Sequence, residues 1–140
     1  MTQITFTVHG EPKAQKRHRD STSKTGQKIK YDPSSADKTD FKWMVIQSRP
    51  QEPFNQPIRL EVVFYFSRPK SHFGSGANSH RIKESAPLWH TSKPDADNCI
   101  KFIKDALNKI FWRDDSLICD VTIKKFYNSQ PRTEVTVTTL

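Results

Sequence analysis

Residues 58–66, with the sequence IRLEVVFYF, place the strongest constraint on how this chain can fold. Every second residue from Ile58 to Phe66 is apolar, in the two-residue period of a β-strand, and Val63 and Tyr65 make the other face partly apolar as well. Apolar side chains on both faces are typical of a strand that is covered rather than exposed. The segment is therefore predicted to be a central strand of a sheet.

Three other segments have the period of half-buried strands: residues 3–9, 117–127 and 133–139. The last two are predicted to form a pair around the turn at 128–131, with Val135 and Val137 facing inward. The chain thus contributes about four strands to one mixed sheet.

Two segments have the 3.6-residue period of amphipathic helices. The first begins at Ser34 or Ser35, ends before Pro50 and should bury a set of mostly apolar side chains: Phe41, Trp43, Met44, Val45, Ile46 and Ser48. The second follows Pro94 with Asp95 as its cap, runs for about four turns and has these apolar positions: Ile100, Ile103, Leu107 and Ile110. The order β-α-β-α-β-β predicts an α/β fold of the α+β type, as a single domain over residues 1–140.

The charge of the chain favours a polyanionic partner. The formal net charge is +8 at pH 7, and lysines and arginines gain affinity for nucleic acid by releasing counterions from phosphates. Residues 10–33 are strongly basic and have almost nothing to bury, so they are interpreted as a loop or hairpin. Its basic side chains are the predicted contacts to the DNA backbone: Lys13, Lys16, Arg17 and Arg19. A merely solvated basic loop is the alternative.

Several classes of protein have no support. The chain has no run of 18 apolar residues and no signal-peptide pattern, which favours a cytoplasmic protein without membrane spans. Cys99 and Cys119 lie in apolar patterns without zinc-ligand spacing, so both are predicted to be reduced core thiols. No phosphate-binding loop, dinucleotide fingerprint or histidine metal motif is present.

Acidic residues are concentrated in one stretch of this basic chain. Residues 91–120 hold five basic residues and six acidic ones, and the acidic residues are Asp95, Asp97, Asp105, Asp114, Asp115 and Asp120. Asp97 and Lys101 are one helical turn apart on the face opposite the apolar stripe, and two or three aspartates are enough to bind Mg²⁺. From spacing alone an ordinary charged helix face, with Asp97 and Lys101 as an ion pair, fits better than a metal site.

The order of motifs changes that balance. Lys93-Pro94-Asp95-Ala96-Asp97-Asn98, then Lys101, Asp105-Ala106-Leu107 and Trp112-Arg113-Asp114-Asp115, together resemble the signature of the RusA family of Holliday junction resolvases. Residues 90–120 carry the likeness most strongly, and residues 93–120 would form the catalytic core. The resemblance implies a bacterial or phage-encoded α/β homodimer that cuts four-way DNA junctions by paired symmetric nicks in recombination and repair.

The same resemblance implies a set of site residues. Asp95, Asp97 and Asp115 match the family's catalytic acids, which hold Mg²⁺ or, in its place, Mn²⁺, and Lys101 matches its essential lysine. Lys93 would contact DNA, and the choice of Asp115 over its neighbour Asp114 stays open. A broader nuclease for branched or single-stranded DNA and a non-catalytic DNA-binding protein are the alternative functions.

The stretch from Ser67 to Ser92 lacks periodicity and is predicted to be a long loop, a feature that in compact domains is usually functional or disordered. Phe73, Trp89 and His90 could stack on unpaired bases at a junction centre. Anchoring of the loop is the more ordinary role for these aromatic side chains.

Overall fold

The computed structural model describes residues 1–17 and 19–140. Its main sheet has the strand order β1-β6-β4-β5 and is built from these strands: β1 Gln3–His9, β4 Ile58–Phe66, β5 Ile118–Tyr127 and β6 Arg132–Thr139. β6 runs antiparallel to both β1 and β4, whereas β5 runs parallel to β4. The sheet is therefore mixed, as predicted.

β4 is an interior strand, which confirms the prediction from its sequence. Its side chains alternate between buried and partly buried along the whole strand, and Ile58, Leu60 and Phe64 have no exposed surface. Val135 and Val137 of β6 are also fully buried on the same side, as expected. Burying these apolar side chains contributes about 1.5–3 kcal/mol each and holds the sheet to its helical layer.

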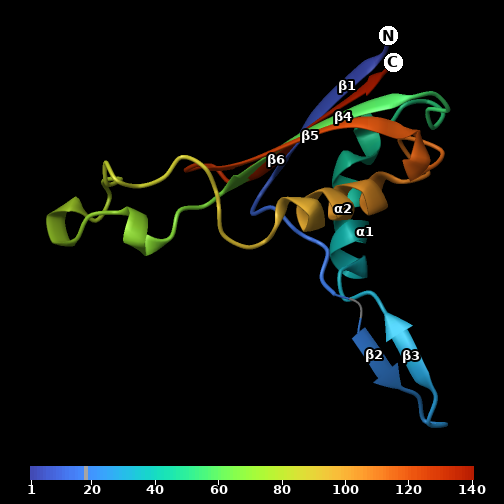
Figure 1. Ribbon diagram of the computed structural model, residues 1–140, viewed down its shortest axis with the longest axis horizontal. Helices are drawn as coiled ribbons and strands as arrows, with labels where there is room; N and C mark the ends of the chain where they lie inside the picture. Colours follow the sequence, from blue (N-terminus) through green and yellow to red (C-terminus); the bar gives the residue numbers. More distant parts are fainter. Residues whose placement is uncertain (18) are drawn as a thin grey trace.

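Two helices cover one face of the sheet (Figure 1): α1 Ser35–Val45, which continues into the 3-10 helix η1 Ile46–Ser48, and α2 Ala96–Leu107. The rings of Phe41 and Phe102 pack edge to face between α1 and α2, with centroids 5.8 Å apart. The order β-α-β-α-β-β and the α/β class are confirmed, and a short hairpin follows β1. No helix in the described part of the chain is long and apolar enough to span a membrane.

Two segments project from this body (Figure 1). The basic stretch after β1 forms the hairpin of β2 Arg19–Thr22 and β3 Lys28–Tyr31, which extends away from the helices. The segment after β4 is a long loop that contains only two short 3-10 helices, η2 Lys70–His72 and η3 Gly76–Asn78.

The last two strands do not pair with each other, so the predicted hairpin is wrong. β4 lies between β5 and β6 and bonds to both. Strands in a sheet are about 4.8 Å apart, so a step over one strand is roughly 10 Å, and the four-residue turn at 128–131 is long enough to cross it. As an interior strand, β4 needs a hydrogen-bonded strand on each side, and the crossing places β5 on one side and β6 on the other.

The buried face of α1 is narrower than predicted. Phe41 and Val45 are buried, but Trp43 and Met44 are 65% and 64% exposed. The second helix is shorter than predicted and ends at Leu107, because Asn108 leaves the helical conformation (ψ 137°) and Lys109 then adopts a left-handed backbone (φ 68°) that turns the chain. That turn brings Phe111 and Trp112 into the core, where both are fully buried.

The two cysteines differ in environment. Cys99 is a buried core thiol, as predicted, whereas Cys119 is exposed and that part of the prediction is wrong. The pairing register of β4 and β5 shifts at Cys119, since Ile58 pairs with Ile118 and Arg59 pairs with Asp120. An extra residue at such a bulge leaves the regular alternation of the strand, which turns Cys119 outward.

Candidate active site

The first turn of α2 presents two unpaired carboxylates. Asp95 occupies the N-cap position, but its side chain makes no capping hydrogen bond, although the sequence predicts it as a cap. Asp97 follows in the first turn, and both residues are exposed. Neither forms an ion pair within residues 1–17 and 19–140. The oxygens of both side chains are therefore available to a cation.

These carboxylates lie near the buried thiol of Cys99 and the partly buried Lys125. Burial raises the pKa of Cys99 to about 11; the charge of Lys125 opposes this rise, and those of Asp95 and Asp97 add to it. The two aspartates and Lys125 thus share one electrostatic neighbourhood at the start of α2. The raised pKa keeps the Cys99 thiol protonated near neutral pH.

The basic loop packs directly against the first turn of α2, at Asn98. The backbone N–H of Gln15 donates to the carbonyl of Asn98 at 3.0 Å. Lys16, Arg17 and Lys101 thereby surround a hollow of about 430 Å³, whose floor includes Gln15 and Asn98. Lys101 is exposed and makes no ion pair with Asp97 or any other described carboxylate. Three cationic side chains therefore line this hollow next to Asn98 of α2, and none of them forms an ion pair with a described residue.

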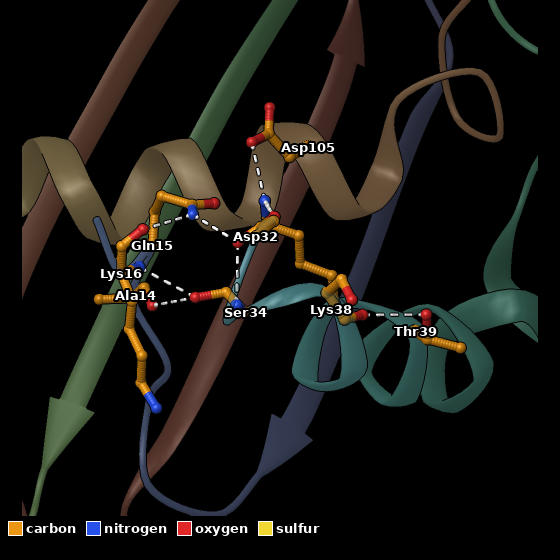
Figure 2. Close-up of polar contacts among 9 residues, drawn as sticks. Ala14, Gln15, Lys16, Asp32, Ser34, Lys38, Thr39 and Asp105 are labelled. Atoms are coloured by element: carbon orange, nitrogen blue, oxygen red, sulfur yellow. Dashed lines mark hydrogen bonds and ion pairs between the residues drawn. The ribbon is translucent and has the colours of Figure 1, made fainter. Parts of the chain in front are cut away.

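A polar network holds this loop in place (Figure 2). The amide of Gln15 donates to Asp32 at 2.8 Å, and the backbone N–H of Lys16 donates to the hydroxyl of Ser34 at 2.9 Å. Lys38 of α1 bridges Asp32 at 2.7 Å and Asp105 of α2 at 3.1 Å. The basic loop, α1 and α2 are thus joined at one point.

The network shifts the pKa values of its charged members. Burial alone would raise the pKa of Asp32, but hydrogen bonds from Lys38, Gln15 and the Ser34 backbone lower it to about 2. Burial likewise opposes the charge of Lys38, while its bonds to Asp32 and Asp105 raise its pKa. Both groups are therefore charged near neutral pH, and the bridge persists there.

Four of the six clustered acids have partners away from the start of α2. Asp105 is bound by Lys38, and Asp120 pairs with Arg59 at 2.8 Å. Asp114 accepts from the backbone N–H of Ser116 at 2.9 Å, and hydrogen bonds from the side chain and the backbone of Ser116 lower its pKa. Asp115 is partly buried and accepts from the indole N–H of Trp112 at 2.8 Å. Of the six, only Asp95 and Asp97 have no side-chain partner among the described residues.

Asp115 lies at the opposite end of the domain from Asp95. It belongs to the 3-10 helix η4 Asp115–Leu117, and β5 begins at Ile118, one residue after the predicted start of the strand. From there to Lys125, which contacts the loop before Asp95, β5 runs for about 23 Å. The helix α2 runs for about 18 Å in the opposite direction, away from Asp95. Accordingly, the described residues contain no group of three His, Cys, Asp or Glu side chains able to hold one metal ion.

The predicted DNA contacts are placed unevenly. Lys16 and Arg17 border the site, and the exposed Lys93 lines a second hollow with Pro94, Asp95 and Asn98. Lys13 comes earlier in the loop than these residues and lines a different cavity, beside α1. Arg19 begins β2, but its side chain, like all of His18, lies outside the described residues.

The aromatic residues of the long loop mainly anchor it. His90 is 8% exposed and stacks on Phe66 with ring centroids 3.8 Å apart. Burial, together with the charge of Lys125, lowers its pKa, so the ring is neutral near pH 7. Trp89 packs on Phe126 but is 53% exposed, and Phe73 is partly buried. His90 is thus an anchor, whereas Trp89 keeps a free surface.

Sequence reasoning missed the residues that position the site. The loops around α2 are held by polar bonds from four residues: Gln15, Ser34, Lys38 and Lys125. No period or short motif marks such residues, because their partners lie far away along the chain. The one signal in the sequence was the position of Lys125, which takes the place of an apolar residue in the alternating pattern of this strand.

Comparisons with known proteins give the family. The family model described as Endodeoxyribonuclease RusA matches residues 9–138. The uncharacterized protein YqaN of Bacillus subtilis (strain 168) is 39% identical over 139 residues, which cover 96% of this chain and 94% of that protein. A protein named crossover junction endodeoxyribonuclease rusA, from Lactococcus phage r1t, is 28% identical over 113 residues, covering 77% of this chain and 76% of that protein.

The fold and the site together define a basic α/β protein with exposed carboxylates next to unpaired cations, a combination suited to work on phosphodiesters. The chain belongs to the RusA family of endodeoxyribonucleases. This confirms the resemblance seen in residues 93–115.

Proposed function

We propose that this chain is a Mg²⁺-dependent endodeoxyribonuclease that resolves four-way DNA junctions by paired symmetric nicks. It would act as a homodimer in recombination and repair, in the cytoplasm of a bacterium. The observation that carries the proposal is the position of two exposed carboxylates, Asp95 and Asp97, at the start of the helix whose Asn98 and Lys101 line a hollow with Lys16 and Arg17. Family membership supports the choice of DNA as the substrate.

The residues at the start of α2 suit a hard divalent cation. Mg²⁺ is usually held by one or two carboxylates together with waters and substrate phosphates, and Asp95 and Asp97 supply two free carboxylates. The bound ion would polarise the scissile phosphate and lower the pKa of a water. Mn²⁺ should substitute, because it prefers the same oxygen ligands.

The surrounding cations would hold the DNA and balance charge. Lys16, Arg17 and Lys93 are exposed and can follow phosphates without reading sequence. Lys101, one turn beyond Asp97, would offset the negative charge that builds on the phosphate during cleavage. Removing Lys101 should therefore slow cutting more than it weakens binding.

A second copy of the chain would complete the ligand set. Within one chain Asp115 is separated from Asp95 by the length of both α2 and β5. In the proposed homodimer, the Asp115 carboxylate of one protomer would join Asp95 and Asp97 of the other, which gives two composite sites.

Mixing two inactive variants tests this composite site. Asp97→Asn and Asp115→Asn each remove one carboxylate, and in a mixed dimer one of the two composite sites keeps all three. We therefore expect the mixture to nick one strand while each variant alone stays inactive. A mixture as inactive as its components would refute the shared site.

The main experiment measures cutting of a labelled four-way junction with and without Mg²⁺. We expect Asp97→Asn to abolish cutting but to bind the junction as well as the native protein, while Asp40→Asn, which removes an exposed carboxylate from α1, cuts normally. Cutting without any divalent ion, or full activity in Asp97→Asn, would refute the mechanism. Equal cutting of forks, flaps and single strands would indicate a broader nuclease, and junction binding without cutting would indicate a DNA-binding protein.

A further inference from the structure

Lys125 interrupts an apolar strand face. On the side of β5 that faces the helices, Val121, Ile123 and Tyr127 are apolar, and Lys125 stands between the last two. Its partner in the register of β4 is Phe64, which has no exposed surface. An ammonium group at such a position is costly unless hydrogen bonds replace its water.

The ammonium group finds those bonds in the loop before α2. Its Nζ donates to the carbonyl of Ser92 at 2.9 Å and to the carbonyl of Pro94. It also lies over the ring of Phe66, 5.7 Å from the centroid. In the part of the chain that the structure describes, no carboxylate forms an ion pair with it. Among the described residues, the ammonium group of Lys125 therefore binds the carbonyl oxygens on both sides of Lys93 and no carboxylate.

The same strand end also docks the segment that precedes this loop. The N–H of His90 donates to the carbonyl of Lys125 at 3.0 Å, and the N–H of Tyr127 donates to the carbonyl of Leu88 at 2.9 Å. On the other side of Asp95, its carbonyl accepts the first hydrogen bond of α2, from Cys99 at 3.0 Å. The backbone of Asp95 is thus held between α2 and the ammonium group of Lys125.

We propose that Lys125 is a positioning residue, which sets where the Asp95 carboxylate stands relative to Asp97. The proposal rests on the function proposed above, because it concerns the carboxylates assigned to the metal. Residues that orient metal ligands typically change metal affinity or activity by about 10-fold to 100-fold when they are removed. The donors of Lys125, rather than its charge alone, would provide this effect, since the two carbonyls are its only described polar partners.

Three variants of the full-length protein test the proposal. Lys125→Met keeps the apolar stem but removes the donors, and Lys125→Arg keeps both donors and charge. Lys124→Met removes the same charge from the adjacent residue, which is exposed on the opposite face of β5. Equal thermal unfolding midpoints for native protein and variants would establish that all are folded.

Hydrogen exchange tests the positioning itself without metal or DNA. We expect the backbone amide of Cys99, which donates to the carbonyl of Asp95, to exchange at least about tenfold faster in Lys125→Met than in Lys124→Met, with Lys125→Arg between them and nearer to native. Unchanged exchange in Lys125→Met, or equal exchange in the Met and Arg variants, would overturn the proposal.

Metal binding and cleavage then test the consequence. Calorimetric titration with Mn²⁺ should show an affinity about 10-fold to 100-fold lower in Lys125→Met than in Lys124→Met, and single-turnover cutting at subsaturating Mg²⁺ should fall by a similar factor, while metal-free junction binding matches the control. Native-like metal affinity and cutting would refute the role of Lys125. If the native protein neither bound metal nor cut DNA, the proposed function would fail, and with it the metal-site role of Lys125, whatever the exchange result.

Discussion

Replacing Asp32 by Asn should measurably destabilise the protein at neutral pH. The pKa of Asp32 is lowered from 3.8 to about 2 by Lys38, Gln15 and the Ser34 backbone. One pKa unit corresponds to about 1.36 kcal/mol, so the shift represents roughly 2.4 kcal/mol of stabilisation. The side chain is 21% exposed, and solvent screening reduces the expected cost to about 1–2 kcal/mol.

The pH dependence of this cost follows from the direction of the shift. Because the folded pKa lies below the unfolded value, the stabilisation is fully present above about pH 4 and is lost as the pH falls toward 2. Urea unfolding of native protein and Asp32→Asn at pH 7 and at several values between pH 4 and 2 gives the difference directly. Asp40→Asn is the control, since Asp40 is exposed and forms no ion pair among the described residues.

Two results would refute this reasoning. A cost below about 0.3 kcal/mol at pH 7 would mean that the network around Asp32 contributes little beyond an ordinary surface pair. A difference that stayed constant between pH 4 and 2 would mean that the ionised carboxylate is not its source. If the cost is confirmed, the anchoring of the basic loop on α1 and α2 is an energetic feature of the fold.

Three further predictions concern separate parts of the molecule. Lys16→Ala should reduce the slope of log binding constant against log salt for a junction by about 1, and an unchanged slope would exclude a phosphate contact. A thiol reagent should label Cys119 in the folded protein and Cys99 only on unfolding, because Cys99 is buried and its pKa is raised to about 11; rapid labelling of both would contradict the packing of α2. Trp112→Phe should lower the free energy of unfolding by about 2 kcal/mol, since it removes the buried donor to Asp115, and an unchanged denaturation midpoint would argue against that bond.

The sequence alone determined the elements and the chemistry of the first turn of α2. Local hydrophobic period is set by residues a few positions apart, so β4 and α2 could be recognised without knowing their neighbours. The motif from Lys93 to Asp115 identified the family for the same reason, because its spacing is a property of the chain itself.

Tertiary structure decided which strands and side chains meet. The crossing of β5 and β6 over β4, the outward turn of Cys119 at a bulge and the exposure of Trp43 depend on contacts between distant segments. The same holds for the separation of Asp115 from Asp95 and for the placement of Lys125 against the loop before α2. Periodicity and motifs depend on residues that are close together in the sequence, whereas the packing of distant segments determines where each side chain lies.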